Sequence, residues 1–146
     1  MCGFIVAIIR YNRGMKSEKS IFTKIIDGEI PAHKIYEDDR VLAFLDIHPQ
    51  TEGHTLVVPK TPVDHLWDME DGDYSYLMHI AKRIGGHIKG TLHVPRVGLV
   101  VEGFGVPHVH VHLIPLYNSE DLKKPQDLLG EPDHGALAQM ASSLAL

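Results

Sequence analysis

The longest run of regularly spaced hydrophobic residues lies in the middle of the chain, where an apolar side chain recurs every three or four positions. This spacing predicts an amphipathic helix whose apolar stripe faces a core. Asp71 or Asp73 can cap the start of this helix, and Gly90 can end it. The stripe consists of Tyr74, Leu77, Ala81, Ile84 and Ile88.

Two shorter segments also have helical character. After Ser20, which can cap a helix, the apolar residues at positions 21, 22, 25 and 26 share one face, and Gly28 stops the pattern. Prolines and a glycine interrupt the sequence after Tyr117, but residues 136–146 have the composition of a short helix.

Five segments have the apolar, β-branched composition of strands and end at turn residues. They cover residues 34–37, 41–46, 55–59, 97–101 and 108–115. The third is apolar almost throughout, which predicts a central position in the sheet. Strands that follow one another through short turns favour antiparallel pairing. The predicted fold class is therefore α+β, an antiparallel five-stranded sheet with one long and one short helix, and we expect the helices on one side of the sheet.

Three histidines alternate with apolar residues along the last predicted strand. Successive strand residues point to opposite faces, so His108, His110 and His112 share one face. Their rings then follow one another at intervals of ~7 Å. Rings arranged in this way can ligate a metal, or they can meet an anion such as phosphate while one ring attacks it.

This His-φ-His-φ-His-φ-φ pattern, with φ apolar, resembles the signature of the histidine-triad (HIT) family of nucleotide hydrolases and transferases. Residues 21–32 are similar to the family's opening helix and turn, and residues 41–50 and 53–60 to its central hairpin. The resemblance implies a HIT-like version of the predicted fold at residues 15–118, followed by a C-terminal tail at 119–146, and it implies a homodimer.

Residues 1–14 form an N-terminal extension that begins with an apolar run at positions 4–9. Three interpretations remain open for it. It is an extra edge strand, a weak surface anchor, or a stretch upstream of a true start at Met15.

The chemistry of the triad follows from the properties of imidazole. A neutral ring can attack a phosphorus atom that repels anionic nucleophiles, forming a covalent phosphorus–nitrogen intermediate that water later resolves. The central His110 is the expected nucleophile, and a backbone carbonyl should hold its other ring nitrogen. His108 and His112 then donate hydrogen bonds to the phosphate or the leaving group. The resemblance implies the same roles and adds His54 as an outlying active-site histidine.

The resemblance also implies the nucleotide contacts. Asp46 is expected to accept hydrogen bonds from the ribose, and the backbone N–H groups of Gly105 and Val106 are the donors left for the phosphate. Taken without the resemblance, several of the base-pocket residues are plain core, whereas a buried carboxylate at Asp46 requires partners. The expected base pocket consists of Phe22, Ile25, Phe44, Leu45, Ile47 and Leu56.

The chain departs from the family pattern at three places. Ser20 and Thr23 occupy the positions of a Cys-x-x-Cys pair that binds structural zinc in many relatives, so we expect neither that zinc nor any other metal or cofactor. The loop at 101–107 lacks the polar side chains that normally contact the phosphates. The tail lacks a tryptophan used by some relatives near the leaving group, and Trp67 is the only one in the sequence.

Composition narrows the functional classes. A length of 146 residues favours one domain, and a net charge of −5 argues against a binding face for extended nucleic acid. The single Cys2 excludes an internal disulfide, and no apolar run reaches the ~20 residues of a membrane span. We expect a cytoplasmic protein.

The predicted function is hydrolysis or nucleotidyl transfer at the α-phosphate of a purine nucleotide, with a phosphoramidate or a dinucleoside polyphosphate as substrate. The reaction would pass through a nucleotidyl-histidine intermediate on His110. Two alternatives remain open: a catalytically weak nucleotide-binding regulatory module, and a histidine-rich metal-binding protein.

Overall fold

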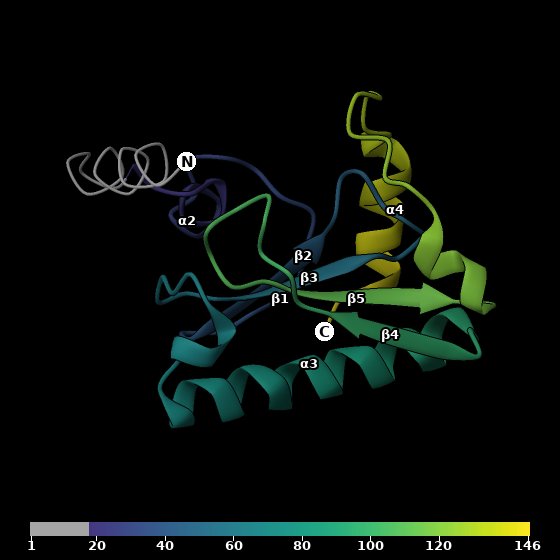
Figure 1. Ribbon diagram of the computed structural model, residues 1–146. Coiled ribbons are helices and arrows are strands. Elements are labelled where there is room, and N and C mark those ends of the chain that lie inside the picture. The colour runs from purple at the N-terminus through teal and green to yellow at the C-terminus, as the bar shows by residue number, and fades with distance from the viewer. Residues whose placement is uncertain (1–17) are drawn as a thin grey trace, which may run out of the picture.

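The sheet of the computed structural model has five strands and is antiparallel throughout (Figure 1). The structure describes residues 18–146, so the expectations for residues 1–14 lie outside this range. The strand order is β1-β2-β3-β5-β4, which confirms the predicted fold class and places the apolar β3 at the centre. The strands are β1 (Lys34–Glu37), β2 (Val41–Leu45), β3 (Thr55–Pro59), β4 (Arg96–Val100) and β5 (Val111–Leu116).

Helices cover both faces of the sheet, so the expectation of one covered side is wrong. The long helix α3 (Asp71–Leu92) and the C-terminal α4 (His134–Leu144) pack on one face, where they share the main hydrophobic core. The short α2 (Ile21–Ile26) closes a second, smaller core on the opposite face. Two single-turn helices, at Leu66–Asp68 and Ser119–Lys123, complete the described elements. No helix within residues 18–146 is long and apolar enough to cross a membrane.

The ends of α2 and α3 show which sequence signals operate. Ser20 caps α2 by accepting a hydrogen bond from the backbone N–H of Thr23, and Gly28 follows with a φ of 79°. Gly90 does not end α3, because the helix continues to Leu92, whose side chain packs against the main core. His93 ends it instead, in the left-handed conformation with a φ of 55°.

The histidine segment keeps its alternation even where it leaves the sheet. β5 begins at Val111, so His108 and His110 precede the strand. The N–H of Val109 donates to the carbonyl of Val63 at 2.7 Å, a contact with the loop after β3. Because the valines at 109 and 111 stay buried in the main core, the three histidines lie on the face that α2 covers.

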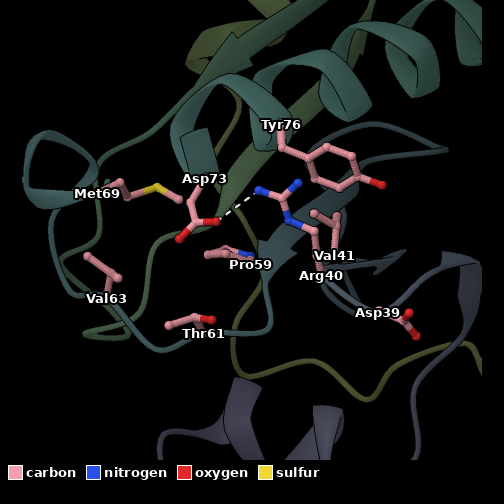
Figure 2. A pocket seen from close by; sticks show the side chains of 9 residues that line it. All are labelled: Asp39, Arg40, Val41, Pro59, Thr61, Val63, Met69, Asp73 and Tyr76. Carbon is pink, nitrogen blue, oxygen red and sulfur yellow. Dashed lines mark hydrogen bonds and ion pairs between the residues drawn. The ribbon is translucent and has the colours of Figure 1, made fainter. Parts of the chain in front are cut away.

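A polar cluster ties the turn between β1 and β2 to the start of α3. Asp38 accepts hydrogen bonds from the hydroxyl groups of Tyr36 and Tyr76. Arg40 reaches Asp73 at 2.9 Å, and its guanidinium lies 4.0 Å from the ring centre of Tyr76. Figure 2 shows Arg40 between the side chains of Asp73 and Tyr76, at the rim of a hollow that Pro59 and Val63 also line. Arg40, the one cationic side chain among the residues that line this hollow, is therefore already paired with the carboxylate of Asp73.

Candidate active site

His110 has one ring nitrogen fixed by the backbone. Its Nδ1 lies 2.7 Å from the carbonyl oxygen of His108. Since a carbonyl can only accept, Nδ1 carries the proton and Nε2 keeps its lone pair. The ring packs edge-on against Phe22 of α2, with 4.8 Å between centroids. These contacts define both the tautomer and the orientation that a nucleophilic imidazole requires.

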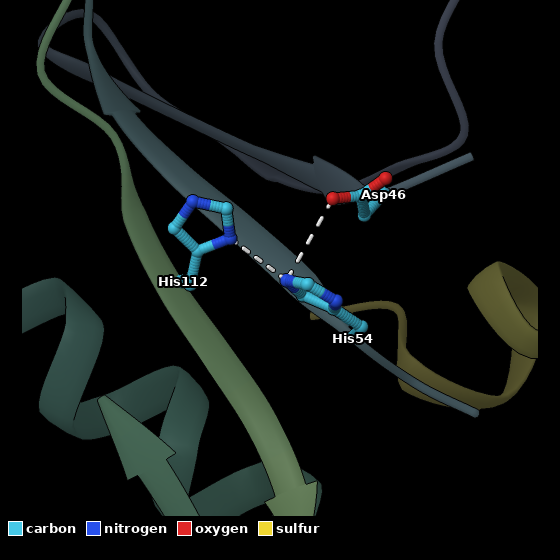
Figure 3. A group of neighbouring side chains, drawn as sticks. All are labelled: Asp46, His54 and His112. Carbon is cyan, nitrogen blue, oxygen red and sulfur yellow. Dashed lines mark hydrogen bonds and ion pairs between the residues drawn. The ribbon is translucent and has the colours of Figure 1, made fainter. Parts of the chain in front are cut away.

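His112 belongs to a chain of hydrogen bonds that begins at a backbone amide. The N–H of Gln50 donates to Nδ1 of His54 at 3.0 Å, so neutral His54 carries its proton on Nε2. That Nε2 lies 2.8 Å from Nδ1 of His112 and 3.7 Å from a carboxylate oxygen of Asp46. Figure 3 shows His54 between these two partners. The proton of neutral His112 is consequently on Nε2, where it is an N–H donor.

The environment keeps this pair of rings uncharged near neutral pH. Burial lowers the pKa of His54, although the Asp46 carboxylate opposes that effect. Burial also lowers the pKa of His112, to about 4, with further contributions from His54 and His110. His112 therefore acts as a neutral hydrogen-bond donor, the form that the hydrogen-bond chain prescribes.

His108 does not take the role expected for it. Its Nε2 lies 2.8 Å from the carbonyl oxygen of Pro59, and its Nδ1 lies 3.3 Å from Oγ of Ser20 and 3.5 Å from Oγ1 of Thr23. Both nitrogens thus have partners within the protein, and the side chain is 1% exposed. Burial lowers the pKa of His108, while the Pro59 carbonyl opposes the shift. His108 joins the start of α2 to β3, and it has no free N–H for a phosphate.

The residues expected to contact the base divide between the two cores. Four of them, including Phe22 beside His110, are buried together in the small core under α2. Ile47 is 40% exposed beyond the end of β2. Leu45 packs in the main core on the opposite face, so the structure does not bring it to the histidines. The four in the small core are Phe22, Ile25, Phe44 and Leu56.

The loop before the triad contains the two residues expected to donate backbone hydrogen bonds to the phosphate, Gly105 and Val106, and it also brings a carboxylate to the histidines. Gly105 is exposed, and Val106 is half-buried against the small core. The carbonyl of Val106 accepts the N–H of His108 at 2.9 Å. Glu102, which sequence reasoning did not single out, brings its carboxylate within 4.8 Å of ring nitrogens of His110 and His112. No periodicity in the sequence indicated that approach, because Glu102 lies in an irregular loop.

Asp46 is more fully engaged than a free ribose acceptor would be. Its Oδ1 accepts the N–H of His48 at 2.8 Å, and its Oδ2 accepts the side-chain amide of Gln126 at 3.0 Å. The same amide donates to the carbonyl of His48 at 2.8 Å. Gln126 and the backbone N–H of Gln50 are further residues that sequence reasoning missed, since each is recognised only through its partner in space.

Within residues 18–146, two groups of side chains have the composition of metal ligands. The first group consists of Asp46, His54 and His112. The second consists of Glu102, His110 and His112. Ligation through Nε2 of His54 would require its lone pair there, and the proton would then move to Nδ1, facing the N–H of Gln50. This hydrogen-bond pattern disfavours a metal in the first group. A metal in the second group would occupy the Nε2 lone pair of His110, or it would require a lone pair on Nε2 of His112, where the hydrogen-bond chain places the proton.

Comparison with known proteins shows what this chain is similar to. A family profile described as the HIT domain matches residues 27–119. The chain is 39% identical over 112 residues to "Protein hit" of Bacillus subtilis, covering 72% of this chain and 76% of that protein. It is 43% identical over 96 residues to an adenosine 5'-monophosphoramidase of Saccharomyces cerevisiae, covering 65% of this chain and 61% of the yeast protein. Among solved structures, a HIT-like protein from Bartonella henselae has a TM-score of 0.74 at 28% identity, covering 88% of this chain and 95% of that one.

Proposed function

Because the chain belongs to the histidine-triad (HIT) family, we propose that it is a hydrolase or nucleotidyl transferase that attacks the α-phosphate of a purine nucleotide. The observation that carries this proposal is the tautomer of His110. Its Nδ1 proton is held by the His108 carbonyl, which leaves the Nε2 lone pair for attack. The proposed substrate is a nucleoside phosphoramidate, in keeping with the activity named for the yeast relative, or a dinucleoside polyphosphate.

In the first step, Nε2 of His110 forms a bond to the α-phosphorus, and the bond from phosphorus to the leaving group breaks. The leaving group takes the bonding electron pair, and an amine leaving group gains a proton from solvent. His112 stabilises charge on a phosphoryl oxygen through its Nε2–H, without giving up the proton.

In the second step, water attacks the nucleotidyl-histidine. Its oxygen forms a bond to phosphorus, the bond from phosphorus to Nε2 breaks, and the electron pair returns to His110. The proton released from water goes to solvent. His108 and His54 act as positioning residues, because the His108 carbonyl holds His110 and His54 holds His112. Asp46, which lies 3.7 Å from His54, accepts the ribose hydroxyls of the nucleotide.

The direct test follows the intermediate by mass spectrometry. Wild-type protein, His110→Ala and the control His79→Ala would be sampled during turnover of an adenosine phosphoramidate and a dinucleoside polyphosphate. His79 is an exposed histidine on α3 and therefore lies outside the site. We expect a nucleotidyl adduct mapped to His110 in wild type and in His79→Ala, and neither adduct nor turnover in His110→Ala.

The second candidate function is a nucleotide-binding module with weak turnover. The approach of Glu102 to His110 and His112 favours the weak turnover of this module, because the carboxylate repels a phosphoryl group at the attacking nitrogen. Binding of the nucleotide without an adduct or turnover in wild type would contradict the enzymatic proposal and support this module. The homodimer and the cytoplasmic location remain predictions.

A further inference from the structure

A segment of the tail reaches Asp46 and is held at both ends. This strap, residues 122–133, follows Asp121, which is 1% exposed and accepts the backbone N–H groups of Tyr117 and Asn118. The carbonyl of Asp121 also accepts the side-chain amide of Gln50 at 3.0 Å. At its other end the strap enters α4, which packs into the main core through Leu137 and its neighbours. The strap is therefore tethered at both ends.

Between those ends, the side chain of Gln126 hydrogen-bonds to Asp46 and His48 in the body of the protein. It is half-buried, whereas the residues on either side of it are exposed. The other side-chain hydrogen bonds and ion pairs of the strap are local: Lys123 with Glu120, Lys124 with Asp121, Asp127 with the N–H of Gly130, and Asp133 with the N–H of Ala136. Both amide hydrogens of Gln126 are used, one for Asp46 and one for the carbonyl of His48. Gln126 is thus a single latch on the carboxylate nearest His54.

The latch occupies hydrogen-bonding capacity that the proposed function requires. If Asp46 accepts the ribose hydroxyls, these must approach carboxylate oxygens that already serve His48 and Gln126. The Gln126 amide is a donor at this oxygen, as a sugar hydroxyl would be. A carboxylate oxygen can accept more than one hydrogen bond, so the competition is for the place beside this oxygen that the Gln126 amide occupies.

We propose that Gln126 is an autoinhibitory latch: its amide occupies the sugar-binding carboxylate Asp46, and the strap releases when a nucleotide binds. The inference rests on the proposed function, because it requires a nucleotide at Asp46. Binding then includes the cost of breaking the two Gln126 hydrogen bonds. Since that cost belongs to the free protein, it is the same for every nucleotide that enters.

Affinity measurements on the full chain test the latch. Dissociation constants for AMP and dAMP would be measured by calorimetry for wild type, Gln126→Ala and Leu129→Ala. Leu129 lies in the same strap and is 98% exposed, which makes it the matched control. Removing the latch should lower both constants by the same factor, about threefold to tenfold, as expected for the loss of a competing hydrogen-bonded contact. Leu129→Ala should leave both unchanged.

The opposite results would overturn the latch. A higher dissociation constant for Gln126→Ala, with a smaller preference for AMP over dAMP, would make Gln126 a contact to the nucleotide. An unchanged dissociation constant for Gln126→Ala would show that the hydrogen bond between Gln126 and Asp46 does not affect nucleotide binding.

Hydrogen exchange tests the release of the strap independently of affinity. The strap should exchange faster when AMP is added to wild type, whereas slower exchange would contradict release. If AMP binds and the His110 adduct forms while Gln126→Ala has no effect, the latch alone fails. If no variant binds AMP and no adduct forms, the proposed function fails, and the latch fails with it.

Discussion

The tautomers of four histidines follow from three backbone groups. The carbonyl of His108 defines His110, the carbonyl of Pro59 defines His108, and the N–H of Gln50 defines His54 and, through it, His112. Backbone groups cannot change their donor or acceptor character, so each ring has a single neutral form that fits its partners. The site therefore has one unprotonated nitrogen ready for attack and one N–H beside it, assigned without reference to a substrate.

Glu102 offers the sharpest test at this scale. Its carboxylate lies within 4.8 Å of nitrogens of His110 and His112, where a phosphate would have to bind. Repulsion between two unit charges at ~5 Å amounts to roughly 1–2 kcal/mol at an intermediate dielectric constant. Glu102→Gln should therefore lower the dissociation constant for AMP by about fivefold to thirtyfold at low salt, and by less at high salt.

Glu70→Gln is the control for this change of charge, since Glu70 is an exposed residue before α3 whose side chain makes no capping hydrogen bond. Equal effects of the two variants would indicate a general change in net charge. An increase in the dissociation constant for Glu102→Gln alone would mean that the carboxylate assists binding, for example by accepting a hydrogen bond from the nucleotide.

At the scale of elements, hydrogen bonds and an ion pair of Asp38 and Arg40 hold the turn between β1 and β2 to α3. Partial burial on its own would raise the pKa of Asp38, but hydrogen bonds from Tyr76, Tyr36 and the N–H groups of Arg40 and Val41 bring it down to about 2. The Asp38 carboxylate correspondingly raises the pKa of Tyr36 to about 12. The charged form of Asp38 is the one that the fold stabilises.

This pKa predicts how stability changes in acid. The unfolded pKa of an aspartate is about 4, so the contribution of Asp38 is present above that pH and is lost as pH falls through about 2. Asp38→Asn should reduce the free energy of unfolding by about 1–2 kcal/mol at pH 7. That difference from wild type should shrink between pH 5 and pH 2 in denaturant titrations. The neighbouring Asp39→Asn, at an exposed position, should show no such dependence, and a pH-independent difference for Asp38→Asn would refute the linkage.

For the whole molecule, local patterns predicted the elements, and pairings between distant residues determined the site. Alternation identified the histidine face, and helical spacing identified α3, because both are properties of consecutive residues. The end of α3 was misplaced because packing of Leu92 outweighed the weak helix propensity of Gly90. The partners of His54 and Asp46 could not be predicted in this way. Gln126 is 80 residues from Asp46 in sequence and meets it only after the tail has packed.

The tail itself is part of the main core, and this leads to a prediction about the stability of the whole molecule. Leu144 of α4 is 0% exposed and packs in the same cluster as α3 and the sheet. The N–H of Leu146 donates to the carbonyl of Ile35 in β1 at 2.9 Å, which ties the end of the chain to the edge of the sheet. Leu144→Ala should lower the free energy of unfolding by about 2–4 kcal/mol in denaturant titrations, because it leaves a cavity in this core.

Leu146→Ala, at a position that is 47% exposed, should cost much less than Leu144→Ala, because its side chain remains largely in water. Since α4 is also the far anchor of the strap, Leu144→Ala should speed hydrogen exchange in residues 122–133 together with α4. A small loss of stability, equal to that of Leu146→Ala, would mean that α4 rests on the domain without contributing to its core. In that case the strap would have one firm anchor, at Asp121, and the tail could leave the site without disturbing the sheet.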